Sequence, residues 1–215
     1  MQGVVETQSA ARPPLRLRDN YSFFFPLVLM VELNMISKSA IHAFLARTDT
    51  PSVTLAAFNA AFTFYFAITS ATEVTVALCL SYMKSRADLV RLLFFSAVLL
   101  SVPMTVALTI VFTDVGSAMF GDWFGLSAQG QWEARFAVGM LALSPPVLLA
   151  RATAFALLML NRRTMIITCS TVIRLSSLAI WLVILPWWLE GAAVGALALV
   201  LCMASETVFS WFFAW

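Results

Sequence analysis

The sequence predicts an all-α membrane protein with six transmembrane helices in a single lobe and both termini in the cytoplasm. Of its 215 residues, 61% are hydrophobic and only 11% are charged, whereas about 25% of the residues of a soluble domain are charged. Six apolar stretches reach the roughly 20 residues that a helix needs to cross a bilayer. We therefore expect a multi-pass protein of the cytoplasmic (inner) membrane, in contact with membrane lipids.

Several other classes of protein are disfavoured by what the chain contains. A net charge of +2 leaves no basic surface for a nucleic-acid partner. The three cysteines, Cys79, Cys169 and Cys202, lie in apolar runs without the spacing of a disulfide framework or a metal site. The sequence has no phosphate-binding loop, no dinucleotide-binding glycines and no nucleophile–base pattern. We predict no catalytic residues, no cofactor and no metal, and hence no enzyme.

The elements follow in order along the chain. Residues 1–20 are polar and basic and predict a flexible N-terminal tail, and residues 21–215 form the transmembrane domain. The six predicted spans are Tyr21–Leu45, Val53–Ser81, Leu89–Phe112, Arg135–Leu160, Thr164–Trp188 and Ala192–Trp215. Turn-forming residues separate most of them. The longer third break predicts a short helix in the membrane interface that stops at Gly121 and Gly125.

The flanking cations predict the orientation of the spans. Basic residues concentrate on the side that holds the N-terminal tail, the second break and the fourth break, and this side should be cytoplasmic. These residues are Arg12, Arg16, Arg18, Lys84, Arg86, Arg91, Arg162 and Arg163. The other side carries only Arg47 and Arg135. Tryptophans should lie at both boundaries, where amphipathic indoles are favourable: Trp123, Trp132, Trp187 and Trp188 outside, Trp211 and Trp215 inside.

Six charged side chains lie within the predicted spans. They are Glu32, Lys38, Glu73, Arg151, Arg174 and Glu206. A charge at the centre of a membrane helix costs about 2.5–3.5 kcal/mol on the insertion scale, so such residues usually face protein or water. All but one fall in a single layer near the membrane midplane by helical rise. Structural ion pairs and a substrate or ion pathway are both open interpretations of this layer.

The first span is unusually polar for a membrane helix. Asn34, Lys38 and His42 are spaced i, i+4, i+8 and form one stripe, whereas Glu32 lies on a different face. Two polar faces predict that protein or water surrounds this helix. His42 is either an imidazole in contact with interfacial water or part of a proton relay. Asn34 and Asn59 could form hydrogen bonds between helices.

Two local motifs concern helix shape. Pro145 and Pro146 should kink or break the fourth span, either as a tolerated irregularity or as a hinge. Gly191 and Gly195 form a GxxxG pattern that predicts close packing of the last helix against a neighbour.

Two segments carry a resemblance to a known family. Phe25-Pro26-Leu27, Leu45-Ala46-Arg47, Pro51 and Leu55-Ala56-Ala57-Phe58 match an opening helix pair, Arg174-Leu175 matches a pair in the fifth span, and Glu206 matches a closing acid. In these features the chain resembles the multidrug/oligosaccharidyl-lipid/polysaccharide (MOP) flippase superfamily, in particular its bacterial branch related to the progressive ankylosis protein. The interfacial segment after the third span also fits.

The resemblance implies a MATE-like lobe of six helices and transport of drugs, glycolipids or anions between two such lobes. The chain departs from the family pattern because it holds one lobe, because Lys38 and His42 stand where amides are expected, and because Thr69–Thr72 lacks an acid–serine–proline signal. A second lobe would come from a homo-oligomer or from a larger membrane complex. We therefore expect a secondary exporter or flippase of an anionic or lipid-linked substrate, with a non-transporting accessory or scaffold subunit as the alternative.

Overall fold

The computed structural model describes residues 17–82, 86–161 and 163–214, and every regular element in these ranges is a helix. The long helices are α1 (Leu17–Leu45), α2 (Pro51–Tyr82), α3 (Arg86–Phe112), α5 (Ala128–Leu141), α6 (Ser144–Leu160), α7 (Thr164–Ile184) and α8 (Ala192–Ala214). The short ones are α4 (Asp114–Ala118), the π-helix η1 (Met119–Trp123) and the 3-10 helix η2 (Leu185–Trp187). The all-helical prediction is confirmed for this part of the chain.

Within the described residues, five segments are long and apolar enough to cross a membrane. They are Val28–Leu45, Val90–Phe112, Ala128–Leu160, Thr164–Trp187 and Ala192–Ala214. The second predicted span, Val53–Ser81, coincides with α2 but is not among the five. A sixth span therefore stays a prediction, as does the orientation of the termini. Most of the predicted tail, residues 1–20, lies outside the described residues, although α1 already begins at Leu17.

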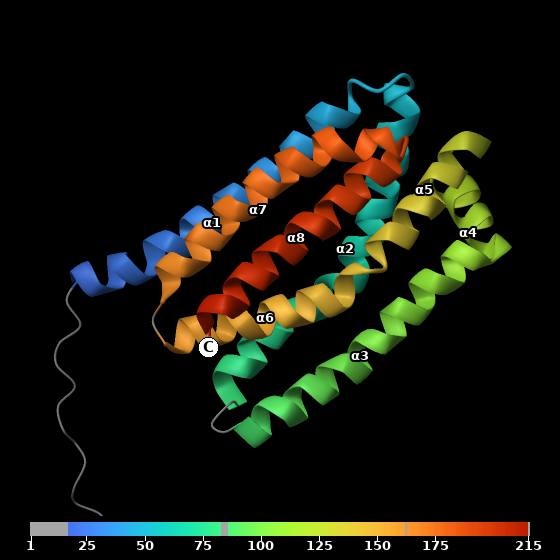
Figure 1. The fold of residues 1–215 in the computed structure, drawn as a ribbon. Coiled ribbons are helices and arrows are strands. Elements are labelled where there is room, and N and C mark those ends of the chain that lie inside the picture. Colours follow the sequence, from blue (N-terminus) through green and yellow to red (C-terminus); the bar gives the residue numbers. More distant parts are fainter. Residues whose placement is uncertain (1–16, 83–85, 162, 215) are drawn as a thin grey trace, which may run out of the picture.

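Helix α8 runs through the middle of the bundle (Figure 1). It packs against α7 on one side and against α5 and α6 on the other, while α1 packs mainly on α7 and α2 mainly on α5 and α6. Small residues allow this central position, since Ala192, Ala196 and Ala198 are entirely buried and their short side chains let neighbouring backbones approach closely. Helix α3 lies at the edge of the bundle, against α2 and α5.

The fourth predicted span is two helices, as its proline pair indicates. Helix α5 ends at Leu141 and α6 begins at Ser144, with Pro145 and Pro146 in the first turn of α6. Proline is tolerated there because the first N–H groups of a helix have no intrahelical acceptor. Ser144 Oγ also donates a 2.6 Å hydrogen bond to the carbonyl of Leu141, which satisfies one orphan oxygen at the break.

The segment after α3 forms the predicted short helix, but Gly121 does not stop it. Gly121 lies inside η1, and the element ends before Gly125, whose φ of 63° suits glycine. Helix α5 then starts at Ala128, well before the predicted Arg135, because Ser127 caps it by accepting the N–H of Gly130. Hydropathy alone misses this polar first turn.

Helix α1 is much more open than its polar sequence predicts. Only 18% of its Val28–Leu45 window is buried, against 61% of the window in α8. Ser37, Ile41 and Leu45 form the buried stripe, since these residues are four apart and share one face. Protein of the described chain therefore covers one side of this helix only, and whether water or further protein covers the other side stays a prediction.

Candidate functional site

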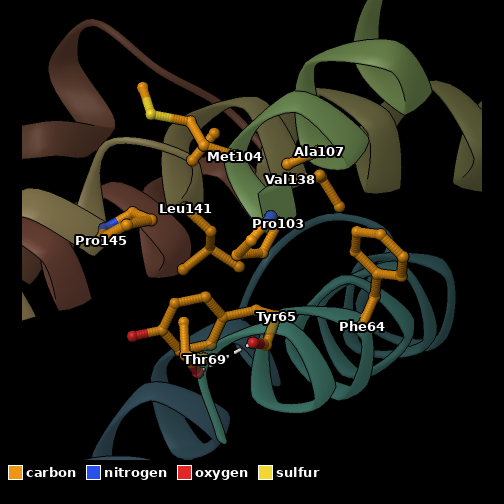
Figure 2. Close-up of a pocket in the computed structure, with 10 residues that line it drawn as sticks. Phe64, Tyr65, Thr69, Pro103, Met104, Ala107, Val138, Leu141 and Pro145 are labelled. Atoms are coloured by element: carbon orange, nitrogen blue, oxygen red, sulfur yellow. Dashed lines mark hydrogen bonds between the residues drawn. The ribbon is translucent and has the colours of Figure 1, made fainter. Parts of the chain in front are cut away.

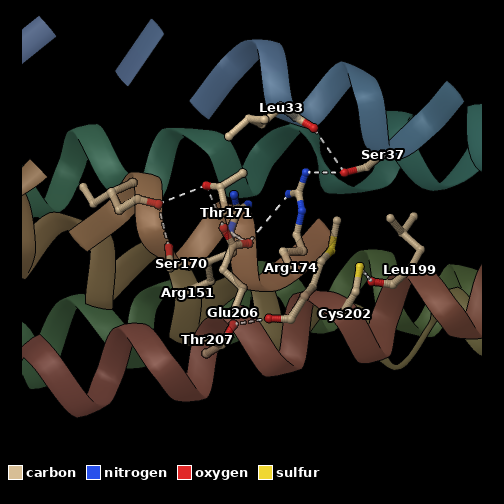
Figure 3. A network of polar contacts seen from close by, with 12 residues as sticks. Leu33, Ser37, Arg151, Ser170, Thr171, Arg174, Leu199, Cys202, Glu206 and Thr207 are labelled. Atoms are coloured by element: carbon tan, nitrogen blue, oxygen red, sulfur yellow. Dashed lines mark hydrogen bonds and ion pairs between the residues drawn. The ribbon is translucent and has the colours of Figure 1, made fainter. Parts of the chain in front are cut away.

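Three of the six predicted intramembrane charges meet in the centre of the bundle. Arg151 of α6 and Arg174 of α7 both approach Glu206 of α8 (Figure 3). Arg151 Nε lies 2.8 Å from Glu206 Oε2, and Arg174 Nη1 lies 3.7 Å from the same oxygen. The Glu206 side chain has no exposed surface. We call Arg151, Arg174 and Glu206 the central ion cluster.

Two hydroxyl groups extend the central ion cluster to other parts of the bundle. Thr171, one turn before Arg174 on α7, donates to Glu206 Oε1 at 3.2 Å. Arg174 Nη2 donates to Ser37 Oγ on α1 at 3.0 Å, and Ser37 in turn donates to the Leu33 carbonyl. The cluster thus joins α1 to α6, α7 and α8, three helices that follow one another more than 90 residues later in the sequence.

The cluster is held by charge more than by directed hydrogen bonds. Arg151 Nε and Glu206 Oε2 are close but lack hydrogen-bond geometry, so the contact is an ion pair. Arg174 Nε and Ser210 Oγ are buried without a hydrogen-bond partner among the described residues. Two guanidinium groups share one carboxylate, so the loss of Glu206 would leave two cations in a low-dielectric interior.

Glu32 and Lys38 do not join this cluster. Both side chains are exposed on α1, and neither makes an ion pair with another described residue. The Lys38 ammonium instead lies over the ring of Phe62 on α2, 4.4 Å from its centroid, which is within cation–π range. The single layer of charges predicted from the sequence is therefore divided between the bundle interior and the surface of α1.

His42 makes a contact between the first two helices. Its Nε2 lies 2.8 Å from Oδ1 of Asn59 on α2, and its ring meets Phe58 edge-on. The predicted ability of Asn59 to bond across helices is confirmed. The side chains of Asn34 and Glu73, two further candidates, lie outside the described residues.

One proline candidate lies beside a small apolar pocket between α2, α3 and the α5–α6 break (Figure 2). Pro145 lines it together with Pro103 of α3, Leu141 of α5 and Tyr65 of α2. Pro146 is exposed and takes no part in the lining. A hinge role for either proline stays a prediction.

The two glycine candidates have different surroundings. Gly195 lies in α8 against α1 and α2: a Cβ there would be 2.8 Å from Ile41 Cγ2 and 3.1 Å from the Phe58 ring. Gly191 precedes the helix at a φ of 65°, so it is not part of a helix-packing face, and a Cβ there would collide with the Glu133 carboxylate. The GxxxG pattern placed Gly191 on a helix face, whereas in the structure it lies one residue before α8 begins.

Glu133 is a functional candidate that sequence reasoning missed. It is buried on α5, and its Oε2 accepts the N–H of Ala192 at the start of α8 at 3.2 Å. A carboxylate is favourable at a helix N-terminus, so this contact stabilises the packing of α8 against α5. Its place near the polar turn AQGQWE gave no sign of burial.

The described residues contain no group of three or more histidine, cysteine or acidic side chains that could hold a metal ion. Comparison with protein-family models, with curated proteins and with solved structures finds no match to this chain. The central ion cluster and the exposed polar side of α1 are therefore the two features of the described chain that bear on function.

Proposed function

We propose that the chain is a transport-type lobe of the inner membrane, a secondary exporter or flippase of an anionic or lipid-linked substrate, which works as an oligomer. The observation that carries the proposal is the position of Lys38. It is an exposed cation inside a predicted span, supported only by the Phe62 ring among the described residues. A cation in that position seldom faces lipid and often marks a substrate pathway.

The other two cations have a different part in this proposal. Arg151 and Arg174 are already bound to Glu206, so they hold the helices in register and do not receive the substrate. His42 lies one turn after Lys38 on α1 and contacts Asn59 of α2, so this pair adds polar groups to the same side. The proposed substrate side is thus formed by α1 and α2. The resemblance to MOP flippases separately leads to the expectation of transport.

The test is the movement of a fluorescent anionic phospholipid across proteoliposomes that contain the purified protein. We expect Lys38→Gln to lower the rate strongly and Lys38→Arg, which keeps the charge, to restore most of it. Arg163→Gln on the exposed cytoplasmic turn predicted before α7 is the matched control and should leave the rate unchanged. Equal rates for Lys38→Gln and the unaltered protein would remove Lys38 from the site. A null result for this lipid and for small organic anions would contradict transport.

A second candidate function, a non-transporting accessory subunit, is favoured by the central ion cluster. An enclosed network that ties four helices together suits a rigid scaffold as well as a carrier. Native mass spectrometry after gentle extraction separates the two candidates. A fixed stoichiometry with unrelated subunits supports the scaffold, and a homo-oligomer without other polypeptides argues against it.

A further inference from the structure

The exposed side of α1 carries a regular apolar seam. Val28, Val31 and Met35 are 60%, 49% and 62% exposed. Their spacing of three and then four residues is the repeat of about 3.5 residues that helix pairs use to pack side by side. Helix α7 covers the opposite side of α1, along the stripe that contains Ser37. The seam is therefore a helix-packing surface that this chain leaves open.

Opposite charges flank this seam. Glu32 and Lys38 are six residues apart, which separates them by about 120° around the helix and about 9 Å along it. Val31 and Met35 lie between them on the helical surface by the same geometry. One flank is thus acidic and the other basic, and both side chains are exposed.

We propose that the α1 seam binds the α1 seam of a second copy of this chain, with the two helices parallel about a two-fold axis. In a two-fold interface the left flank of one helix faces the right flank of the other. Glu32 then meets the partner's Lys38, and Lys38 meets Glu32 of the partner subunit. Side chains on a helix lean toward its N-terminus, and lysine is longer than glutamate, so Lys38 reaches further back and shortens the offset along the axis.

Charge complementarity identifies the occupant as a copy of the chain. Lipid tails can cover Val28, Val31 and Met35, but they provide no cation for Glu32, and an uncompensated carboxylate in the bilayer is costly. A second copy provides its own Lys38 as that cation, and the two-fold symmetry gives two such ion pairs in each dimer. The inference rests on the oligomer in the proposed function and specifies its interface. An anionic substrate would compete with the partner's Glu32 for Lys38.

Cysteine cross-linking in native membranes tests the seam without altering its charges. Met35→Cys is placed in a Cys169→Ser background, because Cys169 is the exposed native cysteine among the described residues. We expect oxidation to give a covalent dimer. Val98→Cys, 53% exposed on α3, is the matched control and should stay monomeric. Absence of a Met35→Cys dimer, or equal dimer from both variants, overturns the proposal.

Charge reversal tests the pairing itself. Glu32→Lys and Lys38→Glu alone should each raise the dimer dissociation constant by about tenfold, because two-fold symmetry doubles each loss. The double variant should restore it. Single-molecule photobleaching in liposomes of increasing lipid content measures this constant. A double variant no better than the singles contradicts the pairing.

The two proposals fail separately. A dimer through α1 without lipid or anion transport keeps the interface and removes the transport function. Transport by a protein that shows no α1 cross-link keeps the transport function and removes the interface. A stable complex with unrelated subunits and no self-association removes the interface as well.

Discussion

Helices α1 and α8 each place a glutamate in an apolar helix, but only α8 has counterions for it among the described residues. Each is an apolar segment long enough to cross a membrane, and each holds one glutamate. Glu206 of α8 is fully buried between Arg151 and Arg174. Glu32 of α1 is exposed, with no ion pair inside the described chain. The glutamate of α8 is thus paired with cations inside the bundle, whereas the glutamate of α1 faces the surroundings.

The difference comes from the packing of the two helices. Helix α8 has neighbours on both sides, so its acid meets cations from α6 and α7. Helix α1 is covered on one side only, and the side that carries Glu32 faces away from the bundle. The position of a helix in the bundle therefore determines whether its glutamate is buried and ion-paired or exposed on the surface. Residue type alone does not distinguish the two.

The largest contrast between the helices should appear when each acid is removed. Glu206→Ala leaves Arg151 and Arg174 buried without a counterion, and we expect the free energy of unfolding to fall by about 3–5 kcal/mol. Glu32→Ala is the matched control and should change little when the monomer is measured, because its side chain is exposed there. Reversible unfolding in mixed micelles measures both. Similar losses in the two variants would contradict the contrast.

A smaller effect is expected at the place where α8 meets the end of α1. Gly195→Ala would put a Cβ 2.8 Å from Ile41 Cγ2, and overpacking of this kind costs about 1–3 kcal/mol. The control is Gly139→Ala, where the nearest atom would be 3.6 Å away. That variant should be neutral or slightly stabilising, because alanine is the better helix former. A harmless Gly195→Ala would show that α1 and α8 do not pack as described.

Two serines on α1 sharpen the comparison within a single helix. Ser37 is buried and accepts from Arg174, whereas Ser39 is exposed and donates to the Met35 carbonyl of its own helix. Ser37→Ala should cost about 1–2 kcal/mol, because a charged donor loses its acceptor. Ser39→Ala should be close to neutral. Thermal unfolding in the same detergent compares them directly, and equal midpoints would argue against the link between α1 and the central ion cluster.

The smallest effect concerns the cation on the exposed side of α1. A double-mutant cycle of Lys38→Met and Phe62→Leu should give a coupling of about 0.5–1 kcal/mol, the usual range for an exposed cation–π contact. Lys38→Arg should keep most of it. A coupling near zero would mean that Lys38 is not held against α2 by the Phe62 ring.

Much of the helix pattern was predictable because it depends on local sequence. The ends of α3, α7 and α8 agree with the apolar stretches to within a few residues, and Pro145–Pro146 marks the α5–α6 break. The start of α5 was missed because its first turn is polar, and Ser127 rather than hydropathy begins it. Gly191 was misassigned because a residue just before a helix shares the same small-residue pattern.

The candidate site was predictable only as a set of residues. Arg151, Arg174 and Glu206 were expected to lie at similar depth, because helical rise converts residue number into depth. Their meeting could not be derived, since the rotation of each helix depends on how all its neighbours pack. Glu133 illustrates the same limit, because its burial arises from the position of the α8 N-terminus.

By itself, the sequence determined that this chain is helical and apolar, where most helices begin and end, and which charges lie within them. Hydropathy and turn chemistry act over a few residues, so one chain is enough to read them. Only the tertiary structure decided that α8 is central and α1 peripheral, and hence that Glu206 is enclosed while Glu32 and Lys38 face outward. That decision depends on side-chain packing between distant segments, which restricts helix rotation and is not encoded in any one local pattern.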